Sequence, residues 1–442
     1  MLNYETPLKL DFVRGDATAL TIPAHAESLR EAGPAFLTAA FHCFGSLADD
    51  NEVTRITHLE AFGGGNSGHK VFMTVEYAHA TPGLHTELFV KFSRDFADGF
   101  RDRRRQELAA EVHLATLSRL PAFPISVPIA YFADFEHESG TGLLITQRIA
   151  FGRDGIEPLH PKCMDHELAE PLAYYRAIVT TLARLIAAHK SGRLSPQVEQ
   201  LFPFDITAAA ADIPIPWSEA QLLERVQRYA TFAARCPQLL PVNVRTPTFI
   251  AQLLRDAPRL LQHEATIKRF LVTQPDFIAL CHWNTNIDNA WFWRDASGAL
   301  QCGLLDWGMV RQMNVATALW GGLCGASRDI WDHHLDELLQ LFIVELHTHD
   351  GPLLEITRLK LNLQLSTAML GLAMMMDVPA LILARLPEVV DAAGLLDPIM
   401  HRDEIARSFL HVFTSFLNLW QTQDFGASLD QLLANEIATQ GI

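Results

Sequence analysis

Two short segments in the second half of the chain carry side chains that could hold a metal ion and orient a hydroxyl group. The stretch 280–289 reads Leu-Cys-His-Trp-Asn-Thr-Asn-Ile-Asp-Asn, and 304–308 reads Leu-Leu-Asp-Trp-Gly. The amide oxygen of Asn289 and the carboxylate of Asp306 are hard ligands suited to Mg²⁺. Asn284 cannot accept a proton at neutral pH, although its amide oxygen can orient a hydroxyl. These residue types indicate a magnesium site near a group that orients a hydroxyl.

The segment between the two motifs must set their spacing. Residues 290–294 and 300–305 have the composition of strands and flank a turn at 295–298, so we expect a two-stranded ribbon. It would present Asn289 at one end and Asp306 at the other. The alternative for an isolated Asp-Trp-Gly is an ordinary turn at a strand end.

A lysine in the first half of the chain could bind an anion. Lys91 lies centrally in the apolar strand predicted at 87–92, and a buried ammonium group requires an anionic partner. A glycine-rich stretch at 63–68 precedes it and separates two predicted strands, where backbone N–H groups could point at anions. A plain hairpin turn and a solvent-facing edge-strand lysine are the alternatives.

Hydrophobic periodicity divides the chain into a β-rich part and a helical part. We expect an α+β protein with a helical extension at 1–50, a sheet domain at 51–150, and a mostly helical domain at 151–442. The sheet domain would hold five strands and one helix. The predicted strands are 58–62, 70–77, 87–92, 129–135 and 142–149, and the predicted helices include 27–47, 101–120 and 174–189.

Composition excludes some partners. The chain has 442 residues, 49% of them hydrophobic, and a formal net charge of −16, so it can bury large cores and lacks the basic surface of a nucleic-acid binder. An acidic surface favours a cationic small-molecule partner. The most apolar stretch, 365–383, is interrupted by Asp377 and Pro379 and predicts a buried helix instead of a membrane span.

Cysteine usage and the N-terminus bear on location. The six cysteines form no Cys-x-x-Cys pair and no zinc-type cluster, which is typical of free thiols in a reducing compartment. The N-terminal sequence lacks the features of a signal peptide. We therefore expect a cytoplasmic protein. The cysteines are Cys43, Cys163, Cys236, Cys281, Cys302 and Cys324.

The order of these parts resembles the protein-kinase-like superfamily, in particular its small-molecule branch of aminoglycoside phosphotransferase and choline kinase type. The resemblance covers about 59–319 and rests on the glycine-rich stretch, Lys91, the spacing of His282 and Asn289, and the later Asp-Trp-Gly. It implies a bilobal fold with a small antiparallel-sheet N-lobe and a large helical C-lobe. Substrate helices would come from 190–275 and 325–420.

The resemblance also implies a nucleotide site for ATP and Mg²⁺. Lys91 would bind the phosphates and pair with Glu111, with Glu107 as the competing acid, while Asn289 and Asp306 would hold the metal. The remaining nucleotide contacts implied are the phosphate-covering loop and the backbone hinge for adenine, namely Gly64, Gly65, Asn66, Ser67, Gly68, Gln147 and Ile149.

The catalytic loop departs from the family at one position. Asn284 stands where these kinases have the catalytic Asp, His282 would be a structural histidine, and Asp288 is a possible substitute base. Trp283 could fill the core beneath the loop or line an aromatic acceptor pocket. The function implied is phosphorylation of a hydroxyl on a small molecule. The alternative is a pseudokinase-like nucleotide- or metabolite-binding protein without phosphoryl transfer.

Overall fold

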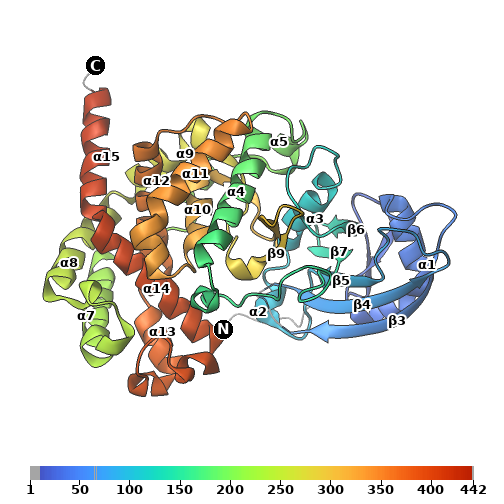
Figure 1. Cartoon of the computed structure of the whole chain (residues 1–442), viewed down its shortest axis with the longest axis horizontal. Helices are drawn as coiled ribbons and strands as arrows, with labels where there is room; N and C mark the ends of the chain where they lie inside the picture. The colour runs from blue at the N-terminus through green and yellow to red at the C-terminus, as the bar shows by residue number, and fades with distance from the viewer. Residues whose placement is uncertain (1–9, 64, 66, 441–442) are drawn as a thin grey trace. The chain divides into compact units, whose positions relative to one another are not determined.

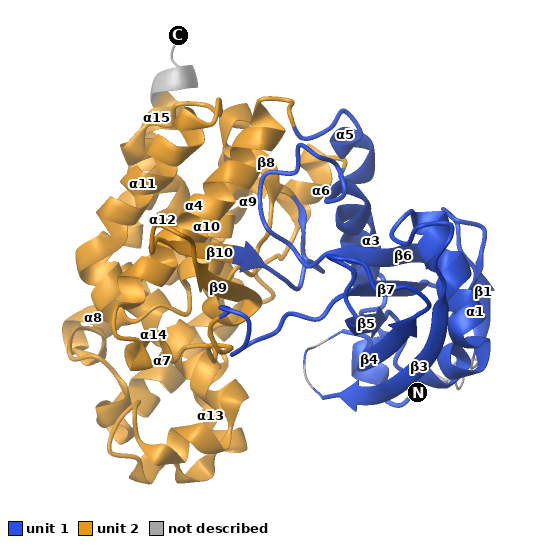
Figure 2. Ribbon diagram, turned by 45° about the vertical axis from the view of Figure 1, so that its right-hand side comes forward, with its two compact units in different colours: residues 1–156, 194–202, 303–311 blue, residues 157–193, 203–302, 312–442 orange. Residues whose placement is uncertain are grey.

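The structure is a computed structural model that describes residues 10–440 except two positions of the glycine-rich stretch, 64 and 66 (Figure 1). The chain forms two compact units (Figure 2). The first contains the chain up to Ile156 together with Leu194–Phe202 and Gly303–Arg311. The second contains Glu157–Arg193, Pro203–Cys302 and the chain from Gln312. The segment with Asp306 therefore belongs to the first unit, although in sequence it follows 280–289, the segment that resembles a kinase catalytic loop and is called the catalytic-loop motif below.

The first unit is built on a five-stranded antiparallel sheet, as predicted. The strand order is β3-β4-β5-β7-β6, and the α+β class is confirmed. A separate pair of short strands, β1 (Phe12–Arg14) and β2 (Thr21–Pro23), lies near the N-terminus. The five strands are β3 (Val53–Phe62), β4 (His69–Tyr77), β5 (Glu87–Phe92), β6 (Ala130–Glu136) and β7 (Thr141–Gln147).

The two faces of this sheet carry different side chains and contact different helices, because side chains alternate along each strand. One face packs its apolar residues against helix α1 (Ala26–Phe44) in a single buried cluster. That helix covers the sheet and is part of the first unit (Figure 1). On the other face, near β6 and β7, lies helix α3 (Glu107–Leu117). The second face also carries Lys91.

The helix predicted at 101–120 is interrupted. The structure has a short helix α2 (Gly99–Asp102), turns, and then α3. The carboxylate of Asp102 is buried and accepts from Arg94 at 2.7 Å and from the backbone of Asp95. This ion pair ties the end of α2 to Arg94, and residues 103–106 after it form turns.

The second unit is mostly helical. No single helix among the described residues is long and apolar enough to cross a membrane, and the apolar stretch near 365–383 is a bent pair, α12 and α13, with a 48° angle. The helices are α4 (Pro171–Lys190), α6 (Ile206–Ala211), α7 (Glu219–Arg235), α8 (Pro247–Gln262), α9 (Glu264–Val272), α10 (Val315–Leu323), α11 (Leu335–Thr348), α12 (Ile356–Met374), α13 (Val378–Arg385), α14 (Glu404–Gln423) and α15 (Phe425–Gln440); α5 (Val198–Leu201) belongs to the first unit.

Short strands surround the catalytic-loop motif. β8 (Ile278–Cys281) leads into it and belongs to a two-stranded sheet with β11 (Arg311–Asn314). The predicted ribbon is present as β9 (Ala290–Arg294) and β10 (Leu300–Leu304). Asn289 directly precedes β9, and Asp306 follows β10 by two residues.

Candidate nucleotide and acceptor sites

A buried charge cluster lies on the second face of the sheet in the first unit. Lys91 on β5 is only 2% exposed. Its ammonium donates to the carboxylate of Glu111 on α3 and lies 3.2 Å from Oδ1 of Asp306. Glu111 lies 20 positions and Asp306 lies 215 positions after Lys91 along the chain. The structure therefore brings together the lysine, the helix acid and the Asp-Trp-Gly acid that sequence reasoning grouped.

Local packing selects Glu111 over the competing acid. Glu111 is buried beside the apolar residues of α3, whereas Glu107, one turn earlier, accepts from Arg104 at 2.6 Å. A Cβ atom at Gly308 would lie only 3.0 Å from Oε1 of Glu111. Glycine thus lets the Asp-Trp-Gly turn approach the helix closely. Asp306 itself has a left-handed backbone, with φ 63°, an unusual conformation for a non-glycine residue.

The charges of this cluster keep Lys91 protonated. Burial alone would lower the pKa of Lys91, but the negative charges of Glu111 and Asp306 outweigh it, so the pKa is raised above its usual value. The Asp306 side chain is 39% exposed. The cluster therefore joins a buried ammonium group to a carboxylate that reaches solvent and could accept a cation.

A second lysine, which sequence reasoning missed, lies beside Lys91. Lys70 on β4 is the direct cross-strand partner of Lys91, and it is buried. Burial, and next the charge of Lys91, lower the pKa of Lys70. Like charges opposite one another in a sheet are destabilising. Asp306 and Glu111 offset part of this repulsion, and a bound anion would offset more of it.

The glycine-rich stretch lies next to this second lysine. Gly65 has φ 74°, and a Cβ atom there would fall 1.9 Å from the Lys70 ammonium nitrogen. Gly68 has φ 60°, and a Cβ atom there would lie 2.0 Å from the carbonyl oxygen of Phe92. The left-handed φ favours glycine at both positions, and at Gly68 the backbone oxygen also leaves no room for a Cβ atom. Ser67 between them is half-buried, whereas Gly64 and Asn66 lie outside the described residues.

The two predicted hinge residues, Gln147 and Ile149, lie at the end of β7 and just after it. Gln147 ends β7, and its backbone N–H donates to the carbonyl of Ile129 at 2.8 Å. Ile149 is buried. On the sheet face that carries the lysines, Phe72 and Phe89 lie 6.1 Å apart. The guanidinium of Arg148 lies over the Phe72 ring at 3.7 Å, so a nucleobase held near this hinge would meet a guanidinium as well as aromatic rings.

At the nucleotide site that the resemblance implies, replacing Lys70 by methionine should weaken ATP binding about tenfold or more, because a charge-assisted contact to phosphate is worth roughly 1.5–3 kcal/mol. The change removes a repulsion from Lys91 together with attractions to Asp306 and Glu111, so stability is measured separately from affinity. ATP affinity and melting temperature would be measured for Lys70→Met and for Lys70→Arg, which keeps the charge. Equal affinity in Lys70→Met and wild type would contradict a phosphate contact.

The same lysine predicts a pH dependence. Its pKa is lowered below 10.5 in the free protein, and a bound phosphate would raise it again, so binding takes up a proton wherever the free lysine is neutral. ATP affinity should therefore fall as pH rises through the lowered pKa. Lys70→Met should lack this part of the pH profile, and titration calorimetry at several pH values would measure it.

The catalytic-loop motif belongs to the second unit and is organised by its own hydrogen bonds. The backbone N–H of Asn284 donates to Nδ1 of buried His282 at 3.1 Å. The side-chain oxygen of Asn284 accepts from the side-chain amide of Asn286 at 2.7 Å. The backbone carbonyl of Asn284 accepts from the side-chain amide of Asn289 at 2.9 Å. His282 thus orients the loop, and the Asn289 amide nitrogen is held by the backbone.

Two glycines let a helix approach this loop. A Cβ atom at Gly321 on α10 would lie 1.5 Å from the carbonyl oxygen of Trp283, and one at Gly322 would lie 2.7 Å from Oγ1 of Thr285. No larger residue fits without moving the loop. The adjacent glycines in α10 were a sequence signal for this close approach.

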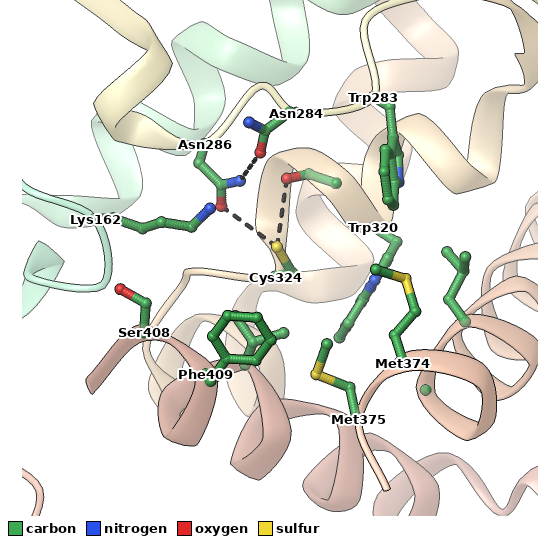
Figure 3. A pocket seen from close by; sticks show the side chains of 14 residues that line it. Lys162, Trp283, Asn284, Asn286, Trp320, Cys324, Met374, Met375, Ser408 and Phe409 are labelled. Atoms are coloured by element: carbon green, nitrogen blue, oxygen red, sulfur yellow. Dashed lines mark hydrogen bonds between the residues drawn. The ribbon is translucent and has the colours of Figure 1, made fainter. Parts of the chain in front are cut away.

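The remaining predicted residues have different surroundings. Asp288 lies in a short 3₁₀ turn, Ile287–Asn289, and its charge acts on the buried thiols of Cys163 and Cys324. Trp307 is buried and donates to the carbonyl of Leu304 at 3.0 Å, which is a packing role. Trp283 differs from Trp307, because it lines a cavity beside Asn284 (Figure 3).

The predicted metal ligands do not form a complete protein site. Among the residues that the structure describes, no group of three or more His, Cys, Asp and Glu side chains could hold a metal ion. A single carboxylate and an amide oxygen fit Mg²⁺ that takes its other ligands from phosphate and water. Asp306 and Asn289 belong to different units, so their convergence on one ion stays a prediction.

No protein-family model and no curated protein matches the sequence. Several solved structures are distantly similar. Plasmodium vivax ethanolamine kinase has 12% identity and a TM-score of 0.39, covering 83% of each chain. The AMP complex of a spectinomycin phosphotransferase has 11% identity and a TM-score of 0.38, over 80% of this chain and 93% of that one. The GDP complex of an aminoglycoside 2′-phosphotransferase variant has 12% identity and a TM-score of 0.37, over 85% of this chain and 95% of that one.

Proposed function

We propose that the chain is an ATP- and Mg²⁺-dependent phosphotransferase that acts on a hydroxyl group of a small molecule. The observation that carries the proposal is the contact of buried Lys91 with both Glu111 and Asp306. A buried lysine with a solvent-reaching carboxylate beside it suits a polyphosphate and its metal. The opposed Lys70 adds positive charge at the same place.

The proposed reaction transfers the terminal phosphoryl group of ATP. A bond forms between the acceptor oxygen and the γ-phosphorus, the bond from that phosphorus to its bridging oxygen breaks, and ADP leaves. Asn284 would orient the acceptor hydroxyl. Its amide cannot take the proton, which passes to water or to a phosphate oxygen. Mg²⁺, held by Asp306 and Asn289, would supply charge neutralisation.

A second candidate is a nucleotide- or metabolite-binding protein without phosphoryl transfer. The observation that favours it is the amide at position 284, which is held by a second amide, that of Asn286, at 2.7 Å. Neither amide group can act as a base. Loose phosphoryl transfer needs little base catalysis, so this observation does not exclude the enzyme.

The decisive experiment measures ATP-dependent transfer and ATP-induced thermal stabilisation with Lys91→Met. We expect wild type to be stabilised by Mg-ATP and to phosphorylate alcohols from a panel, and Lys91→Met to lose both. This variant leaves Glu111 buried without its partner, which costs roughly 3–5 kcal/mol. The double variant Lys91→Met with Glu111→Leu should recover the melting temperature but not ATP binding. Unchanged ATP binding in the double variant would contradict the proposal.

A further inference from the structure

A cavity of about 170 Å³ lies inside the second unit, beside the catalytic-loop motif. Asn284 and Asn286 form one side of it, and Trp283 stands at another (Figure 3). The far wall comes from α12 and α14, represented by Met374 and Phe409. None of the described lining residues comes from 190–275, one of the two segments expected to supply substrate helices. The cavity is therefore built by the loop, by the last third of the chain and by Lys162.

The walls of this cavity are largely apolar and polarisable. Two indoles, Trp283 and Trp320, face it together with the ring of Phe409 and the thioethers of Met374 and Met375. Aromatic rings and thioethers make favourable contacts with flat apolar groups. A cavity of about 150 Å³ with apolar walls holds a benzene-sized molecule in another protein. The size thus suits one aromatic ring with small substituents.

Two of the lining residues carry a buried polar atom without a hydrogen-bond partner among the described residues. Nε1 of Trp283 and Oγ of Ser408 are buried and make no hydrogen bond within the described part of the chain. Both groups can donate, and buried donors are normally satisfied by protein, water or ligand. Both atoms are shielded within the protein, so they do not by themselves specify the polar groups of a ligand.

The charge on the wall is positive. Lys162 lines the cavity, and the described lining residues include no Asp or Glu. The charge of Lys162 lowers the pKa of the Cys324 thiol on the same wall more than the charge of Asp288 raises it, although burial, the largest influence, leaves that pKa raised. Two indoles could attract a cation by about 0.5–2 kcal/mol, but a lysine opposes this. The lining therefore disfavours the cationic partner suggested by net charge.

We propose that this cavity binds a compact aromatic alcohol, neutral or anionic, with its hydroxyl directed toward Asn284. Such a ligand places its ring between the indoles and thioethers, and its acceptor atoms near Lys162. That this alcohol receives a phosphoryl group rests on the function proposed above. Its binding does not.

Three alcohols of the same shape test the ligand class. The probes are para-(hydroxymethyl)benzoate, para-methylbenzyl alcohol and para-(aminomethyl)benzyl alcohol, which are anionic, neutral and cationic at neutral pH. Binding to the full chain without ATP would be measured by ligand-observed NMR and calorimetry. We expect the anion to bind at least about tenfold more tightly than the cation, with the neutral alcohol between. Tighter binding of the cation, or binding of none of the three, would overturn the proposal.

Two variants test the location. Met374→Trp would fill the cavity, and it should fold because Met374 is 44% exposed. Ile405→Trp is the matched control, since Ile405 is 46% exposed and is not among the lining residues. We expect probe binding to fall at least tenfold in the first variant and to persist in the second. Equal binding in both would place the probes elsewhere and overturn the proposal. Lys162→Met should remove the preference for the anion.

Adding Mg-ATP separates this inference from the proposed function. Transfer to the bound probe supports both. Probe binding with the expected preference, ATP binding, and no transfer would support the cavity's ligand class and contradict the phosphotransferase. Transfer to cationic alcohols with no probe binding would support the phosphotransferase and contradict the ligand class.

Discussion

Replacing Asp306 by alanine should abolish the part of ATP binding that depends on Mg²⁺. Asp306 is the carboxylate in contact with Lys91 that also reaches solvent, and a hard divalent cation depends on a charged oxygen ligand. Loss of such a charge contact costs about 2 kcal/mol or more, so affinity should fall about 30-fold or more. The melting temperature with and without Mg-ATP would measure the loss.

A control and a weaker variant sharpen this test. Asp295→Ala changes an aspartate in the turn between β9 and β10, where Oδ1 accepts from Ser297 at 2.8 Å, and it should leave ATP binding unchanged. Asn289→Ala should weaken binding less than Asp306→Ala, because it removes a neutral ligand. An equal rise of melting temperature with ATP in wild type and Asp306→Ala would show that the assigned role is wrong.

The features that sequence reasoning found depend on local patterns. Alternation along 87–92 placed Lys91 in a buried strand, and the apolar neighbours of Glu111 placed it on the inward face of its helix. Both side chains are buried and paired in the structure. Their spacing along single elements carried this information. Their roles toward a nucleotide stay predictions.

The features that sequence reasoning missed depend on register and on distant contacts. Lys70 lies opposite Lys91 only because β4 and β5 pair in one particular register, which no local pattern shows. The cavity beside Asn284 needs Met374 and Phe409 from helices more than 80 residues later in the chain. Lys162 comes from a loop without periodicity. Such partners are set by tertiary packing.

Restoring an acid at position 284 should raise the rate of phosphoryl transfer. General-base catalysis contributes ~10²–10⁴-fold, but loose phosphoryl transfer needs little of it. Asn284→Asp should therefore raise kcat with an accepted alcohol by an amount near the lower end of this range. The loop can accommodate the change, because the Asn284 oxygen already accepts from the amide of Asn286 and a carboxylate accepts in the same way. Initial rates with Mg-ATP would measure the gain.

The neighbouring amide provides a matched control for this prediction. Asn286→Asp places the same charge two residues later, where the side-chain oxygen accepts from the thiol of Cys324 at 3.4 Å. It also removes the donor to Asn284, so it should not raise the rate. A gain in Asn284→Asp alone supports the enzyme, because the new carboxylate then acts on the acceptor hydroxyl. No gain with intact ATP binding supports the binding protein. A sharp loss of rate in Asn284→Asp, from an active wild type, would show that the side-chain N–H group of Asn284 itself holds the acceptor.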